Sequence, residues 1–162
     1  MKVADENIPA TGPIKIKIIV AGGRDYNDYA RMKEIIEKIV KSHDLLPNNV
    51  MIISGHADGA DLLAEKVAED NHYNLKVFPA KWDTTGEYAG FVRNSDMAYE
   101  CNYLKDREGH IPCLLAFWNG KSVGTRSMIH LAMDYNMEIH IFPYQSSNDT
   151  KDKMRDGKNV KY

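Results

Sequence analysis

Five short apolar segments, separated by stretches with helical periodicity, constrain the fold of this chain more than any other feature of its sequence. The segments are rich in Ile, Val and Leu, and the stretches between them repeat apolar residues at helical spacing. We expect strands at residues 14–20, 50–54, 75–78, 111–118 and 138–142. Alternating strands and helices form a parallel sheet with helices on both faces, because the crossover connections are right-handed. The sequence therefore predicts an α/β, Rossmann-like doubly wound sheet of about five parallel strands, in the order 3-2-1-4-5.

The distribution of polar residues divides the chain into one domain and two flanking segments. Residues 1–13 are polar and include two prolines, so we expect a flexible N-terminal arm. Residues 144–162 are polar and charged, so we expect a disordered tail. Between them, residues 14–143 are long enough to bury the core of a single domain. The lysines at positions 15 and 17 indicate that the first strand begins partly exposed.

The overall charge and composition exclude several classes of protein. Twenty-one Lys and Arg residues against 23 Asp and Glu residues give a net charge of −2, whereas a protein held to nucleic acid by phosphate neutralisation carries a basic excess. The sequence has neither an apolar run long enough to span a membrane nor the apolar core of a secretory signal, so we expect a cytoplasmic protein without a membrane partner. The two cysteines, Cys101 and Cys113, are expected to be buried and reduced.

A glycine loop follows the first strand, at the point where the predicted strand order reverses and where ligands of such folds bind. This loop contains Gly22, Gly23, Arg24 and Asp25. Its backbone N–H groups and the Arg24 guanidinium suit a phosphate, and the alternative is a tight turn in which Arg24 pairs with Asp25. The motif lacks the spacing of a dinucleotide fingerprint or of a P-loop.

Loops after the fourth and second strands add further candidates. Gly124 and Thr125 begin the helix after the fourth strand, where they either bind a phosphate or form an ordinary threonine cap. The loop after the second strand contributes Gly55, Asp58, Gly59 and Asp61. We expect Asp58 to bond a ribose or a base, whereas Asp61 either joins the site or only places charge at the start of its helix.

Three residues in the middle of the chain complete the predicted site. Trp82 lies in a long irregular connection, where it either stacks on a base or anchors its own loop. Arg93 and Asn94 are expected in the first turn of a helix over residues 91–104. They are either ordinary surface residues or ligands, and an arginine there opposes the helix dipole, which favours an anionic ligand.

The sequence identifies no complete catalytic or metal-binding motif. It contains no H-E-x-x-H motif, no Cys/His zinc spacing, no Ser/His/Asp set and no calcium loop, so no metal and no cofactor are expected. The catalytic residues therefore stay unknown, with Asp25, Asp58 and Arg93 as candidates.

In their order along the chain, these motifs are similar to those of a known family. They are Ala21-Gly22-Gly23-Arg24-Asp25-Tyr26, Gly59-Ala60-Asp61, Pro79-Ala80-x-Trp82, Ala89-Gly90-x-x-Arg93-Asn94-x-x-Met97, Ala116-Phe117 and Gly124-Thr125-x-x-Met128. The chain resembles the DUF2493 family, also called YspA or YpsA-related members of the SLOG superfamily, over about residues 14–143. The resemblance implies a Rossmann-like fold, a site for a nucleotide or nucleotide-derived ligand, assembly into a homo-oligomer, and a phage or bacterial source.

The same resemblance bears on catalysis. The superfamily includes the LOG enzymes, which cleave the N-glycosidic bond of nucleoside monophosphates with a P-G-G-x-G-T-x-x-E motif. Here Gly124 and Thr125 match that motif, but Met128 stands at the glutamate position and Ser122 replaces a glycine. A thioether cannot act as the carboxylate does, so hydrolysis would require a substitute such as Asp25, Asp58 or Asp61.

The leading functional prediction is therefore a sensor or sequestering protein that binds a nucleotide or a nucleotide-derived small molecule. A nucleotide-processing hydrolase of the LOG type is the first alternative. Binding of single-stranded nucleic acid, as in the superfamily member DprA, is the second, and the net charge disfavours it.

Overall fold

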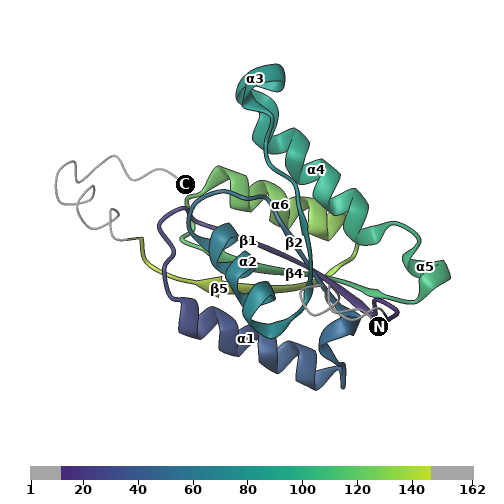
Figure 1. The fold of residues 1–162 in the computed structure, drawn as a ribbon. Helices are drawn as coiled ribbons and strands as arrows, with labels where there is room; N and C mark the ends of the chain where they lie inside the picture. The colour runs from purple at the N-terminus through teal and green to yellow at the C-terminus, as the bar shows by residue number, and fades with distance from the viewer. Residues whose placement is uncertain (1–11, 147–162) are drawn as a thin grey trace, which may run out of the picture.

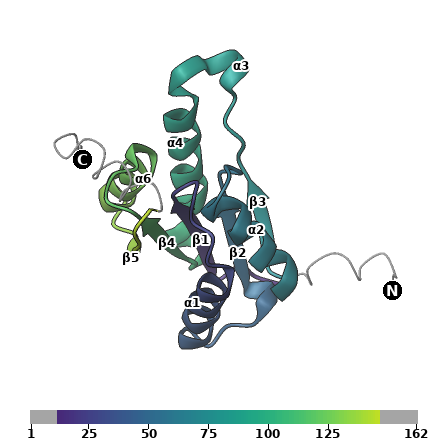
Figure 2. The same cartoon turned by 90° about the vertical axis from the view of Figure 1, so that its left-hand side faces the viewer.

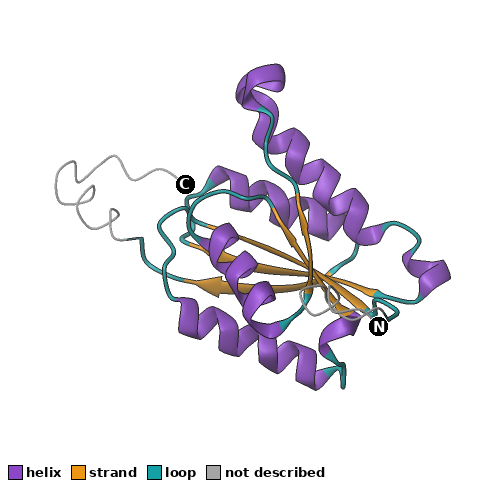
Figure 3. Cartoon of the chain, in the orientation of Figure 1, coloured by secondary structure: helices purple, strands orange, loops and turns teal. Residues whose placement is uncertain are grey.

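A computed structural model describes residues 12–146 as a five-stranded parallel sheet flanked by helices (Figure 1, Figure 3). The strands are β1 (Ile16–Gly22), β2 (Val50–Ser54), β3 (Asn74–Val77), β4 (Ile111–Trp118) and β5 (Glu138–Pro143). They are arranged in the order β3-β2-β1-β4-β5, and each neighbouring pair is parallel. The predicted fold class and strand order are therefore confirmed. Residues 1–11 and 147–162 lie outside the described residues, and with them most of the expected arm and tail.

Helices cover both faces of the sheet. They are α1 (Tyr29–Ser42), α2 (Ala60–Asn71), α3 (Trp82–Thr85), α4 (Ala89–Asn102), α5 (Lys105–Glu108) and α6 (Val123–Asp134), with 3-10 turns at Pro47–Asn49 and Gly86–Tyr88. One core cluster joins α1 and α2 to the strands, and the other joins α4 and α6 to the opposite face. Figure 2 shows the two layers, and it shows α3 and the start of α4 projecting beyond the sheet. None of the helices within residues 12–146 has the length and apolar character of a membrane span.

The central strands are apolar on both faces because both faces are buried. The side chains of Ile18, Ile52 and Leu115 face the α1–α2 layer, and those of Ile19 and Leu114 face the α4–α6 layer. All five are fully buried. Since successive side chains of a strand point to opposite faces, this alternation places hydrophobic residues in both cores.

The start of β1 differs from the sequence-based expectation. The strand begins at Ile16, and Lys17 is 6% exposed rather than partly solvated. Its ammonium group lies 3.3 Å from a carboxylate oxygen of Glu100 and 3.2 Å from that residue's backbone carbonyl. A buried lysine is tolerated here because its charge is paired and hydrogen-bonded.

The connection between β3 and α4 is also more ordered than expected. It contains α3 and a 3-10 turn instead of an irregular loop, and α4 begins at Ala89, two residues before the expected start. Arg93 therefore lies in the second turn of α4, past the first turn where the sequence placed it. The cysteines match their prediction, since Cys101 and Cys113 are both buried and free.

Candidate functional site

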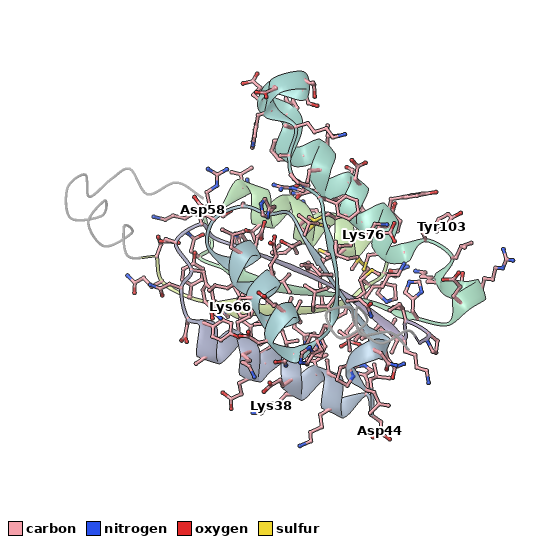
Figure 4. The ribbon with its side chains drawn as sticks, in the orientation of Figure 1. Lys38, Asp44, Asp58, Lys66, Lys76 and Tyr103 are labelled. Carbon is pink, nitrogen blue, oxygen red and sulfur yellow. The ribbon has the colours of Figure 1, made fainter. Side chains whose placement is uncertain are left out.

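Two adjoining hollows open at the carboxyl edge of the sheet, where loops follow β1, β2 and β4. The smaller hollow, of about 160 Å³, is lined by Gly22, Arg24, Asp61, Arg93, Asn94, Gly124 and Thr125, among others. The larger, of about 340 Å³, is lined by Arg24, Gly55, His56, Asp58, Trp82 and Arg93, together with neighbouring loop residues. Figure 4 labels Asp58 at this end of the molecule. Arg24 and Arg93 line both hollows, so the two spaces form one candidate site around a pair of guanidinium groups.

Arg93 is held in position by the loops on either side of it. One terminal nitrogen of its guanidinium donates to the backbone carbonyl of Gly55, and Nε donates to Asn94 Oδ1 over 3.1 Å. Asn94 in turn donates through Nδ2 to the carbonyl of Gly124, 3.2 Å away. This chain of bonds joins the loop after β2, helix α4 and the start of α6. The remaining guanidinium N–H groups of Arg93 are thereby positioned beside the hollows, where they can bind an anion.

Asp61 brings a buried carboxylate to the smaller hollow. It lies in the first turn of α2, is 7% exposed, and accepts a hydrogen bond from the backbone N–H of Ala57 over 3.1 Å. Burial raises the pKa of Asp61 to about 6, although the Ala57 bond and the positive charges of Arg93 and Arg24 act in the opposite direction. A carboxyl group with a raised pKa in a hollow is a common property of functional sites.

Gly55 explains how these two side chains fit beside the backbone. A Cβ atom at this position would lie 2.5 Å from a terminal nitrogen of Arg93 and 2.9 Å from a carboxylate oxygen of Asp61. A side chain at this position would displace the Arg93 guanidinium and the Asp61 carboxylate from where they lie. Gly55 therefore belongs to the site because the side chains of Arg93 and Asp61 lie close to its backbone.

His56 is a residue of the larger hollow that was not among the candidates from the sequence. Its backbone is left-handed, with φ of 64°, and its side chain is 51% exposed in the larger hollow. Its Nδ1 lies 2.8 Å from Glu65 Oε2, which also accepts a 2.7 Å bond from the hydroxyl of Ser54. Since a carboxylate only accepts, Nδ1 carries the proton and Nε2 of the neutral ring is the acceptor. The sequence could not reveal this pair, because Glu65 lies nine positions after His56.

The start of α6 differs in detail from the predicted phosphate loop. Ser122 is the N-cap, and its hydroxyl accepts the backbone N–H of Thr125 over 3.2 Å. The Thr125 hydroxyl is 3.0 Å from the same oxygen, so the two hydroxyls share a hydrogen bond and Thr125 is not the cap. The backbone N–H groups of Val123 and Gly124 are the remaining candidate donors, because they precede the first intrahelical hydrogen bonds. A Cβ on Gly124 would meet nothing within 4 Å, so this part of the helix start is open.

Three predicted residues line neither hollow. Gly23 donates its N–H to the carbonyl of Phe117 over 3.2 Å and so does not offer that group to a ligand. Gly59, with φ of 82°, lies so close that a Cβ would be 2.3 Å from the carbonyl oxygen of Gly23. Asp25 accepts hydrogen bonds from the hydroxyls of Tyr144, over 2.6 Å, and of Ser146. These residues shape the loops or connect them to the segment after β5, and Asp25 lines neither hollow.

Two further features lie next to the site but are not part of it. Met128, at the position of the LOG glutamate, is fully buried in the α4–α6 core and does not reach the hollows. On the other side of Arg93 lies a third hollow of about 540 Å³, whose lining includes Phe78, Lys81 and Val92. The sequence did not predict this space, because it forms only where α4 packs beside the end of β3.

Comparisons with known proteins place this site in a family context. The model of a family described as "YspA, cpYpsA-related SLOG family" matches residues 16–84. Among solved structures, DNA processing protein A (DprA) from Streptococcus pneumoniae is similar with a TM-score of 0.57 and 16% identity, over 89% of this chain and 57% of that chain. The Moco carrier protein from Chlamydomonas reinhardtii has a TM-score of 0.49 and 16% identity, over 89% and 86% of the two chains. No curated protein matches the sequence. This chain thus spans less than two thirds of the DprA chain, and that likeness concerns the fold.

Proposed function

We propose that this chain, whose residues 16–84 match the model of the YspA, cpYpsA-related SLOG family, binds a nucleotide or a nucleotide-derived small molecule. The observation that carries the proposal is the pair Arg24 and Arg93, which lines two adjoining hollows at the carboxyl edge of the sheet. Open α/β sheets bind ligands at this edge, at the point where the strand order reverses. The volumes of the hollows are in the range that small ligands occupy.

The charges of the two arginines favour a phosphate group as the ligand. Burial lowers the pKa of Arg93, the carboxylate of Asp61 opposes this effect, and the positive charge of Arg24 adds to it. The two guanidinium groups therefore repel each other at close range, and an anion between them removes that repulsion. The N–H groups of Val123 and Gly124 at the start of α6 add donors and a favourable dipole on the same side.

The larger hollow suits the sugar and base of such a ligand. Asp58 is exposed there and can accept hydrogen bonds from ribose hydroxyls. Trp82 is 50% exposed. A tryptophan that only anchored its own loop to the core would be more fully buried. An exposed indole beside a charged hollow can stack on a base. Asp58 and Trp82 would contact the nucleoside, and the two arginines would bind its phosphate.

The biological role follows the binding proposal. A protein that holds a nucleotide in this way acts as a sensor or sequestering protein in the cytoplasm. Its assembly into a homo-oligomer stays a prediction, supported by the exposed side chains of Tyr88, Phe91 and Val92 near the projecting start of α4. Such a cluster is common where copies of a chain meet.

Ligand-induced thermal stabilisation tests the proposal. Wild-type protein is heated with a panel of nucleoside mono- and diphosphates, dinucleotides and inorganic phosphate. Arg24→Ala and Arg93→Ala should abolish the rise in melting temperature that the best ligand produces, because each removes a positive charge from the anion. Arg107→Ala is the matched control, since Arg107 is exposed on α5 and lines none of these hollows. Equal stabilisation of all three variants would show that the site lies elsewhere.

A hydrolase is a second candidate, and His56 is the observation that favours it. The Glu65 carboxylate orients its ring as a general base is oriented in many hydrolases. Release of free base from a nucleotide, lost in His56→Asn and in Asp61→Asn, would support this function. Absence of turnover by wild-type protein across the panel of nucleotides would leave binding as the function.

Binding of single-stranded DNA should be tested alongside the nucleotide panel. Nucleic-acid binding through phosphates weakens steeply as salt concentration rises. Strong, salt-dependent binding of an oligonucleotide with no response to small nucleotides would favour a nucleic-acid function over the proposed one.

A further inference from the structure

Three side chains with metal-binding atoms meet at the end of the sheet opposite the candidate site, and a fourth, His43, contacts one of them. Cys113 lies near the start of β4, Glu138 and His140 lie on β5, and His43 is the C-cap of α1. Cys113 is paired directly with Glu138 in the parallel register, so their side chains lie on the same face. In Figure 4, Asp44, which follows His43, is labelled at the far end of the molecule from Asp58.

The donor atoms converge on one carboxylate. His140 Nε2 lies 2.7 Å from Glu138 Oε2, and Cys113 Sγ lies 3.9 Å from the same oxygen. One ligand atom each from Cys113, Glu138 and His140 lies within 4.8 Å of the other two. His43 Nε2 is 3.5 Å from the second carboxylate oxygen of Glu138. Ligand atoms around a bound zinc ion, with bond lengths of about 2.0 to 2.3 Å, are separated by similar distances.

The orientation of His43 is the second observation that points to a cation. Its Nδ1 lies 2.9 Å from the carbonyl oxygen of Ile39. A carbonyl only accepts, so Nδ1 carries the hydrogen and Nε2 of the neutral ring presents its lone pair to Glu138. Two acceptors then face each other, unless a cation lies between them or the ring gains a proton. Metal-binding histidines are commonly held in this way, with the other ring nitrogen donating to a backbone carbonyl.

We propose that Cys113, Glu138 and His140 bind a divalent transition-metal ion of the zinc class, with His43 as the fourth ligand. One sulfur, one carboxylate and two imidazoles form a donor set that zinc accepts in tetrahedral sites. His140 is about two-fifths exposed, which gives the ion access from solvent. The bound ion joins the end of α1 to β4 and to the edge strand β5, and so has a structural role independent of the proposed nucleotide site.

Binding requires the Cys113 thiol to lose its proton to solvent. The incoming ion replaces that proton and forms the metal–sulfur bond, with no change of oxidation state. Metal binding should therefore release a proton and strengthen as pH rises.

Cobalt spectroscopy on the tag-free, full-length protein tests the proposal. Co²⁺ should bind with a thiolate-to-metal charge-transfer band and tetrahedral d–d bands, and Zn²⁺ should abolish both. Zn²⁺ should also raise the melting temperature. His140→Gln and Glu138→Gln, at partly exposed positions, should lower the affinity by at least about 100-fold, since loss of even an outer partner costs about 10- to 100-fold.

The second cysteine supplies the matched control. The chain contains two cysteines, and Cys101 lies in the α4–α6 core on the opposite face of the sheet. Cys101→Ala should keep the charge-transfer band, and Cys113→Ala should lose it. Absence of the band in wild-type protein, its persistence in Cys113→Ala, or unchanged affinity in His140→Gln would overturn the proposal and assign the cluster to protonated histidines paired with Glu138.

Discussion

Replacement of Asp61 by asparagine should stabilise the protein at neutral pH. Burial raises the pKa of Asp61 from 3.8 to about 6, even though the Ala57 N–H bond and two arginines favour the charged form. The folded state therefore holds the proton more tightly than the unfolded chain does. Below about pH 4 the carboxyl group is neutral in both states and costs nothing. As pH rises from about 4 to about 6, stability falls, and above that range the loss is complete.

The size of this effect follows from the two pKa values. At about 1.4 kcal/mol per pKa unit, the ionised Asp61 carboxylate lowers the free energy of unfolding by about 3 kcal/mol at pH 7. Asparagine is neutral at every pH, has nearly the same shape, and can still accept the N–H of Ala57. Asp61→Asn should therefore equal the wild type near pH 4 and exceed it by about 3 kcal/mol at pH 7. A buried carboxylate kept at such a cost is typical of residues retained for function.

Urea denaturation of both proteins between about pH 4 and pH 8 measures this difference. The exposed Asp58, which lies in the loop three residues before Asp61, supplies the control, since Asp58→Asn should stay within about 0.5 kcal/mol of wild type across this range. Nucleotide titration of Asp61→Asn should show binding at least as tight as that of the wild type, because the variant removes a negative charge beside Arg24 and Arg93. A stability difference that does not change with pH, or a less stable Asp61→Asn at pH 7, would refute the reasoning.

Three further substitutions test other features of the structure. Gly59→Ala should lower the free energy of unfolding by more than about 3 kcal/mol in urea denaturation, because the added Cβ would meet backbone atoms. Gly86 is the control, since it also has a positive φ but a Cβ there would meet nothing within 4 Å, and Gly86→Ala should cost about 1 kcal/mol. Similar losses of stability in the two variants would contradict this packing. Gly124→Ala should stabilise α6 by about 0.5–1 kcal/mol yet weaken nucleotide binding by calorimetry, and unchanged affinity would move the ligand away from this helix start. Burial alone would raise the pKa of Glu100, but bonds from two lysines outweigh it and lower that pKa, so its contribution to stability is present at neutral pH and lost as pH falls through the acidic range. Glu100→Gln should remove this acid sensitivity, and an unchanged pH profile of unfolding would argue against the pairing.

The strands could be predicted because the apolar pattern that marks each of them extends over only a few neighbouring residues. The bounds expected for β2 and β4 match the structure, since both strands are continuous apolar runs between polar or glycine-containing loops. Helix α4 begins two residues before the predicted start, because Ala89 and Gly90 are small residues that add little to the apolar periodicity by which a helix is recognised. Lys17 was misplaced at the surface because its partner Glu100 is 83 positions away in the sequence.

The candidate site could be predicted only in part. Glycines, arginines and aspartates in loops after the strands are recognisable as ligand-binding types, and most of the predicted residues do line the hollows. Their individual roles were not accessible, because Asp25 and Asp61 look alike in sequence. The structure directs Asp25 to the hydroxyls of Tyr144 and Ser146, and it buries Asp61 near Arg93.

By itself, the sequence determined that this chain alternates strands and helices and that its glycine loops gather at one edge of a parallel sheet. Hydrophobic periodicity acts over a few residues, and right-handed crossovers leave few ways to join such elements. Only the tertiary structure decided which side chains meet. Arg93 and Gly55 are 38 positions apart, and Cys113 and Glu138 are 25 apart, yet each pair is in contact. Those contacts depend on strand register and helix packing, which bring together atoms whose spacing along the chain carries no signal.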